Sequence, residues 1–204
     1  WSMQSQFSAK SQGTWPEFLN TLDYLVVAGG GSGGNYGARG GGGAGGYRES
    51  AGTATGSYTV SPLGAGNAKV TPGVYTITVG AGGTVTSSQA LGGAGTNSVF
   101  ACITSAGGGA GFGCNPGSAF PGDGGSGGAG VFATAAGDGN TPPVSPPQGN
   151  PGGSGAAYPA LTASGGGGAG AVGGNNTPSA GGAGGAGVTS NITNTPTQRA
   201  GGGG

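Results

Sequence analysis

The chain has 204 residues, of which 58 are Gly and 13 are Pro, whereas these two types together make up about 12% of an average protein. Five Lys and Arg residues balance five Asp and Glu residues, and there is no His. So few scattered cations exclude a phosphate-binding patch, and no apolar run approaches the roughly 20 residues that cross a bilayer. We therefore expect neither nucleic-acid binding nor membrane insertion.

Residues 1–23 differ from the rest because they contain a single Gly and several large apolar side chains. Trp1, Phe7, Trp15 and Phe18 are too large to be left in water, so we interpret this segment as an arm for attachment or oligomerisation. The alternative is an arm that folds back onto its own domain. The arm is also the only part of the chain where we expect any helix, and the following residues, 24–204, form a glycine-rich domain.

Gly29, Gly31 and Gly34 follow an apolar run and match the G-x-G-x-x-G spacing of dinucleotide-binding loops. That motif needs a helix to begin inside it. Residues 35–46 are themselves rich in Gly, and each Gly costs a helix up to about 1 kcal/mol relative to Ala. We interpret the match as accidental and expect no nucleotide and no other cofactor.

The insert at about residues 57–104 carries most of the strand signal. Tyr75, Ile77 and Val79 alternate with Thr, a pattern that predicts a half-buried strand. We therefore expect a small antiparallel sheet in this insert. Further strand candidates are residues 24–28, 57–60, 69–70 and 97–104.

Elsewhere Gly is concentrated in eight blocks, separated by connectors that carry Pro, Asn and hydroxyl residues typical of turns. The blocks are approximately residues 28–34, 40–46, 105–113, 121–130, 149–157, 164–174, 179–187 and 199–204. They lack the period of three that collagen requires, and the apolar fraction of 33% with so little charge argues against disorder. The layout predicts rods joined by loops.

A glycine rod in the polyproline II conformation has three residues per turn and no internal hydrogen bonds, so it needs neighbouring rods to satisfy its backbone. We predict a non-classical, mostly irregular and β fold: a sandwich of packed polyglycine II rods with a small antiparallel sheet and almost no α-helix. Side chains inside the blocks should be confined to outer or widened rows. This expectation applies to Ala44, Ala110, Ala129, Ala169 and Ala183.

Five separated motifs, in this order, resemble the glycine-rich domain at the ends of bacteriophage tail fibres. They are YLVVAGGGSGG at 24–34, GGGGAGGYR at 40–48, YTITVGAGG at 75–83, NS with ITSAGGG inside 97–109, and the terminal RAGGGG. The resemblance covers about residues 24–204, and the arm resembles the segment that precedes such domains. Related fibre-tip adhesins are sandwiches of polyglycine rods whose end loops contact a receptor on the bacterial surface.

The resemblance implies a location in the virion and partners of three kinds. The arm would bind other tail-fibre or virion proteins, the loops would bind a bacterial surface glycan or outer-membrane protein, and the chain would form a homo-oligomer. An extracellular surface or a filament is the alternative location.

If successive rods are antiparallel, alternate connectors share one end of the sandwich. That count groups residues 35–39, 114–120, 158–163 and 188–198. The receptor-binding candidates in this group are side chains that stack on sugar rings or hydrogen-bond to glycans and protein loops. They are Tyr36, Arg39, Asn115, Phe120 and Tyr158. The alternative interpretation is that these side chains simply cover the ends of the rods.

Cys102 and Cys114 flank the third glycine block, and they either form one disulfide or are two separate buried residues. Catalysis has little support, because the chain has no His and its five acidic residues are dispersed. Asp123 and Asp138 both occur in G-D-G contexts, which are typical of turns. We expect no enzyme, no catalytic residues and no metal site.

These observations favour a non-enzymatic tail-fibre tip protein that recognises a host-cell receptor. The main alternative is a structural virion decoration, filament subunit or surface coat, in which the glycine lattice is itself the function. An ice-binding protein is a lesser alternative, because that function favours small repeats with Gly at every third position and this chain lacks them.

Overall fold

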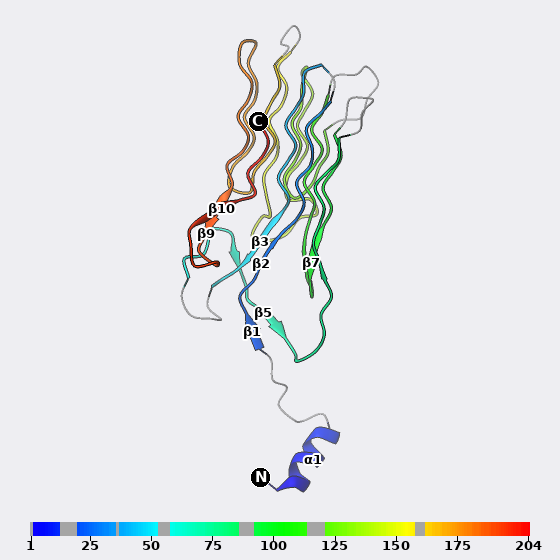
Figure 1. The fold of residues 1–204 in the computed structure, drawn as a ribbon, viewed down its shortest axis with the longest axis vertical. Helices are drawn as coiled ribbons and strands as arrows, with labels where there is room; N and C mark the ends of the chain where they lie inside the picture. The colour runs from blue at the N-terminus through cyan, green and yellow to red at the C-terminus, as the bar shows by residue number, and fades with distance from the viewer. Residues whose placement is uncertain are drawn as a thin grey trace.

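The computed structural model describes residues 2–12, 20–35, 37–52, 58–85, 92–113, 121–157 and 162–204. Extended segments lie side by side along the long axis of the molecule (Figure 1). The chain enters them at one end through strand β1 (Asn20–Leu22), and we call this end the base. The opposite end, which contains the bridged residues Arg39 and Gly113, is called the tip.

The rod formed by residues 40–46 shows how the segments are held together. The N–H groups of Gly40, Gly43 and Gly46 donate to carbonyl groups of the rod 106–112 at 2.7–2.9 Å. The N–H groups of Gly41 and Ala44, one residue further along each turn, donate to carbonyl groups of the rod 164–167 at 2.9–3.0 Å. The carbonyl groups follow the same period of three and accept from the rods 28–34 and 126–129 at 2.8–3.1 Å. Three residues per turn is the geometry of polyglycine II, so the predicted packed rods are confirmed.

The close approach of these rods explains why their inner positions are Gly. A Cβ added to Gly41 would lie 2.2 Å from the carbonyl oxygen of Gly203, and one added to Gly109 would lie 1.8 Å from that of Gly122. Real Cβ atoms do not approach backbone this closely, so a side chain at these positions would separate the rods.

Most of the Ala residues inside the blocks lie in the interior and not on outer rows. Ala44, Ala110, Ala129 and Ala169 are all buried, with exposed fractions of 5%, 3%, 0% and 3%. Among the five, only Ala183 is exposed. The interior of the lattice therefore accepts a methyl group at particular positions. These four residues do not lie on outer rows, and their place on widened rows stays a prediction.

Ten short strands and one helix complete the described fold. The helix is α1 (Met3–Ser11), as expected for the arm. The strands after β1 are β2 (Leu25–Val27), β3 (Tyr47–Ser50), β4 (Gly64–Ala65), β5 (Ala68–Val70), β6 (Ile77–Thr78), β7 (Ser98–Phe100), β8 (Ile103–Ser105), β9 (Val188–Ser190) and β10 (Thr197–Arg199). They form four small sheets in the orders β1-β5, β2-β3-β4, β6-β7-β8 and β9-β10, in which only the β3–β4 pair is parallel.

The predicted antiparallel sheet corresponds to β6-β7-β8, although it is smaller than expected. Residues 58–60 form no strand, and residues 25–27 pair with β3 instead of joining this sheet. The prediction that Tyr75, Ile77 and Val79 form the buried face of a strand is also wrong, because all three side chains are exposed. Strand β6 has two residues and lies at the edge of its sheet, so the described structure covers these side chains only in part.

Side-chain cores lie at the two ends of the rods, and backbone fills the space between them. Two apolar clusters lie at the base, one around Tyr24 and Ile103 and one around Tyr47 and Val188. A third cluster lies at the tip and contains Ala38, Phe112 and Val131, with Phe132 and Ala163 packed against it. The ends therefore carry the side-chain chemistry of the domain.

Two glycine blocks contain chain reversals that the block count did not anticipate. The block 164–174 is a hairpin, because the N–H of Gly165 donates to Gly174 at 2.9 Å and that of Gly168 to Ala171 at 2.9 Å. The block 121–130 also reverses, with the N–H of Gly128 donating to the carbonyl of Gly122 at 2.9 Å. The reversal in 121–130 is followed by another within 131–137, where the N–H of Thr134 donates to Val131 at 3.0 Å and that of Gly137 to Gly128 at 2.9 Å, so these two compensate each other. The hairpin 164–174 has no such compensation and moves the connectors that follow it to the other end.

Candidate functional site

Described residues that flank three of the four connectors singled out by the sequence lie at the tip. Described residues on both sides of 36, 86–91, 114–120 and 158–161 lie at this end (Figure 1). Arg39 is exposed there and forms a β-bridge with Gly113. Arg39 is therefore placed where the count of rods predicted. The other candidates lie outside the described residues: Tyr36, Asn115, Phe120 and Tyr158.

A buried amide organises one side of the tip. The Asn176 side-chain oxygen accepts from the N–H of Ala156 at 2.5 Å and from the Ser164 hydroxyl at 3.1 Å, while its amide nitrogen donates to the carbonyl of Thr162 at 2.7 Å. These bonds fix the connector 175–178 beside the residues that flank 158–161. The alternating count placed these two connectors at opposite ends, and it is wrong here because of the hairpin in block 164–174.

The connector 188–198 lies at the base and not at the tip. Its strand β9 pairs with β10, and the N–H of Asn191 donates to the carbonyl of Thr59 at 3.1 Å. The Ser190 hydroxyl donates to the carboxylate of Glu49 in β3. This connector therefore does not belong to the predicted receptor-binding group, and the uncounted hairpin 164–174 is the reason.

A buried carboxylate ties three segments of the base together. Glu49 is fully buried, and one of its oxygens accepts from the Tyr47 hydroxyl at 2.8 Å and from the N–H of Ser61 at 3.0 Å. Its other oxygen accepts from the Ser190 hydroxyl. Burial, together with the hydrogen bond to this carboxylate, raises the pKa of Tyr47 well above its usual value. Because all of its acceptor sites face inward, we assign this network a structural role.

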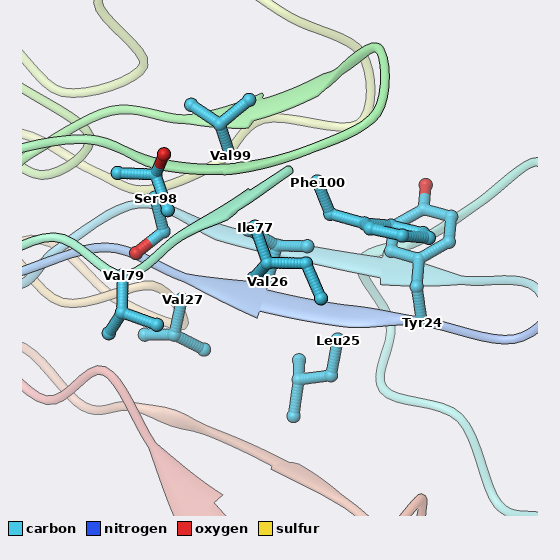
Figure 2. Close-up of a pocket in the computed structure, with 10 residues that line it drawn as sticks. Tyr24, Leu25, Val26, Val27, Ile77, Val79, Ser98, Val99 and Phe100 are labelled. Atoms are coloured by element: carbon cyan, nitrogen blue, oxygen red, sulfur yellow. The ribbon is translucent and has the colours of Figure 1, made fainter. Parts of the chain in front are cut away.

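An apolar groove of about 270 Å³ opens at the base between β2 and the sheet β6-β7-β8. Figure 2 shows the side chains that line it, with Leu25 and Val27 coming from β2, Ile77 from β6, and Phe100 from β7. Val79, which follows β6, is another lining residue. None of the described residues that line the groove is charged. The alternation of Ile77 and Val79 is the sequence signal for this site, although the pattern predicts a half-buried strand and not a groove.

The arm presents its helix to solvent. Ser2 caps α1 by accepting from the N–H of Ser5 at 3.2 Å, and no residue of the helix is buried. Phe7, a predicted attachment residue, is 77% exposed, and Met3, one turn earlier on the same face, is 88% exposed. Trp1, Trp15 and Phe18 lie outside the described residues.

The remaining candidates for chemistry are isolated groups. Cys102 is an exposed free cysteine, so it is not the buried residue of the second interpretation, and Cys114, its predicted disulfide partner, lies outside the described residues. The Asp123 carboxylate accepts the N–H of Asp138 at 2.7 Å, and both residues are exposed. Within the described part of the chain, no group of three metal-ligating side chains occurs, and no helix is long and apolar enough to span a bilayer.

Rods packed through their backbones, with side chains gathered at two ends, define a glycine-rich domain. A family model described as a glycine-rich domain matches residues 7–204, and the chain belongs to this family. The match includes most of the predicted arm. No curated protein and no solved structure matches the chain.

Proposed function

We propose that this chain is the non-enzymatic, receptor-recognising tip domain of a bacteriophage tail fibre. The observation that carries the proposal is the polarity of the fold: the chain enters the rods at the base, while the connectors that carry Tyr36, Asn115, Phe120 and Tyr158 begin and end at the tip. A domain that is attached at one end and has many loops at the other is arranged to present those loops outward.

The arm supports the attachment half of this proposal. An isolated helix of nine residues is only marginally stable in water, and α1 buries none of its side chains. Met3 and Phe7 expose an apolar stripe that another protein of the virion would cover. The partners of the arm are therefore other tail-fibre proteins or further copies of this chain in a homo-oligomer.

The tip supports the recognition half. Its described surface is held rigidly by the Asn176 hydrogen bonds and by the cluster around Phe112, so the connectors extend from a fixed platform. Aromatic residues and Arg39 suit a bacterial surface glycan or the loops of an outer-membrane protein, because rings stack on sugars and guanidinium groups donate several hydrogen bonds. The domain would thus act in the virion at the moment of host attachment.

Competition for host cells tests this function. The purified full chain should block adsorption of the phage that carries it, and the variant with both Tyr36→Ala and Tyr158→Ala should lose this ability. Thr195→Ala, at an exposed position of the base, is the matched control and should compete as well as the unchanged chain. A chain that never competes would refute the function, and full competition by the double variant would refute this binding surface.

A structural decoration, filament or coat protein is the second candidate, and the lattice itself favours it. The backbone of the rod 40–46 is hydrogen-bonded to neighbouring rods on several sides, which makes a stiff unit suited to a shell or filament. Such a protein would be repeated over a shell or along a filament, whereas a tip domain would occur only at fibre ends.

A further inference from the structure

The outer rod of residues 74–85 carries most of the large apolar side chains that the described structure leaves exposed. Val74 is 102% exposed, Val79 83% and Ile77 66%. Val85 and Tyr75 are also exposed, at 56% and 36%. We call these five residues the outer stripe. Apolar side chains gathered on one rod are typical of an interaction surface, whereas single exposed ones are ordinary.

The backbone of this rod is open as well. Strand β6 is at the edge of its sheet and, within the described residues, pairs only with β7. Natural edge strands are commonly protected from further pairing by charged side chains, Pro or bulges. Here residues 70–122 contain no charged residue at all, and residues 71–79 are all exposed. Apart from the shortness of β6, which has two residues, no charged side chain hinders the pairing of this edge with another strand.

We propose that a second copy of this chain pairs with the outer rod, β6 against β6, around a two-fold axis at Thr78. An antiparallel pair centred there places Ile77 opposite Val79 of the second copy, and the reverse pair follows by symmetry. Directly opposed side chains on one face lie about 4.5–5.5 Å apart, so the two apolar faces would merge into one. The result is a continuous sheet in the order β8-β7-β6-β6-β7-β8.

The apolar groove at the base supports this arrangement. Ile77 and Val79 form its outer wall while staying largely exposed, and Leu25 and Val27 lie across from them (Figure 2). A second copy on β6 would extend this wall by placing its own Ile77 and Val79 beside it. Burying the apolar wall of each copy, in addition to pairing the edge backbone, would stabilise the dimer.

Charge favours a second copy over an unrelated partner. The chain has a formal net charge of zero, and the outer stripe carries no charge, so two identical surfaces approach without repulsion. An edge strand is also complementary to itself in the antiparallel orientation, because each copy offers the same alternating donors and acceptors. This inference specifies the surface of the homo-oligomer proposed above, and it does not depend on which receptor the tip binds.

Sedimentation equilibrium of the full chain, over a range of concentrations, tests the dimer. The unchanged chain should show a monomer–dimer equilibrium. Ile77→Lys and Val79→Lys should each raise the dimer dissociation constant at least about 100-fold, because each substitution enters a two-fold interface twice and each entry should cost at least about tenfold. Val172→Lys is the control, since Val172 is 56% exposed elsewhere and should leave the equilibrium unchanged.

Cross-linking tests the register. In a chain with both native cysteines replaced by Ser, Thr78→Cys should form a disulfide-linked dimer on oxidation, and Thr71→Cys, seven residues away on the same exposed segment, should form far less. Circular dichroism of every variant should show an unchanged spectrum below its melting range, because these positions are exposed and the fold of each copy is kept. A chain that stays monomeric, a dimer that survives Ile77→Lys, or equal cross-linking at both positions would overturn the proposal. Adsorption tests of Ile77→Lys separate this outcome from failure of receptor binding.

Discussion

Gly43 and Ser126 approach so closely that a Cβ on Gly43 would lie 2.2 Å from the carbonyl oxygen of Ser126. These residues belong to two adjacent rods, and Ser126 in turn donates its N–H to the carbonyl of Ala44 at 3.1 Å. The hydrogen bond and the close approach have the same cause, since rods without side chains can come within backbone bonding distance. Dense hydrogen bonding then offsets the large conformational entropy that Gly loses on folding.

Gly43→Ala should destabilise the domain because the new methyl group meets two carbonyl oxygens of the neighbouring rod, those of Ser126 and Gly127, at 2.2 and 2.6 Å. Overpacking of this kind costs about 1–3 kcal/mol. Gly66→Ala is the control, since nothing lies within 4 Å of its added Cβ, and it should hold or raise stability by up to about 1 kcal/mol. Urea unfolding of both variants measures the difference, and equal stabilities would contradict close packing of the rods.

Ser126→Ala should leave the domain as stable as before or up to about 1 kcal/mol more stable. The Ser126 hydroxyl is fully buried and has no hydrogen-bond partner within the described structure, so its removal relieves an unsatisfied polar group. Ser105→Ala should instead lose about 1 kcal/mol, because the Ser105 hydroxyl donates to the carbonyl of Gly46. If thermal melting ranks the two variants in the opposite order, the assignment of these hydroxyl groups is wrong.

Glu49→Leu should lose about 3 kcal/mol or more, since it leaves three buried donors of Tyr47, Ser61 and Ser190 without an acceptor. Glu49→Gln should lose less, because its amide oxygen can still accept from Tyr47 and Ser61 and its amide nitrogen can donate to the Ser190 hydroxyl. Chemical denaturation gives both values. A Leu variant as stable as the Gln variant would show that the carboxylate does not hold the base together.

Stability should fall as the pH rises above about 10, the ordinary pKa of Tyr. Burial raises the pKa values of Tyr24, Tyr47 and Tyr58 in the folded chain. A group whose pKa is raised by folding contributes its full stabilisation below the unfolded pKa and loses it as the pH increases through the folded one. Urea midpoints between pH 8 and 11.5 test this, and Tyr47→Phe should flatten the decline. A midpoint that stays constant would contradict the assigned burial.

Particular residues show which parts of this fold the sequence predicts. The Gly blocks predict rods, because runs such as 40–46 favour neither a helix nor a side-chain core. The reversals inside 121–130 and 164–174 escape prediction, since a turn made of Gly and Ala resembles the rod around it. The donors that Glu49 meets come from residues as far away as Ser190, and sequence spacing carries no information about such a contact.

The positions of the candidate sites could likewise be predicted where the chain reversals are visible in the sequence, and not where they are hidden. The tip position of Arg39 was predictable because the first reversal, between blocks 28–34 and 40–46, coincides with a clear connector. The base position of 188–198 was not, because the hidden hairpin 164–174 precedes it. The apolar alternation of Ile77 and Val79 was visible in the sequence, but whether another layer covers a strand depends on tertiary packing.

Labelling of intact particles tests the central claim, the polarity of attachment and recognition, most directly. An antibody raised against the tip connector 175–180, most of which is exposed, should be seen by electron microscopy only at the free ends of the tail fibres. Label spread over a shell or along the length of a filament would contradict the account and favour the structural alternative.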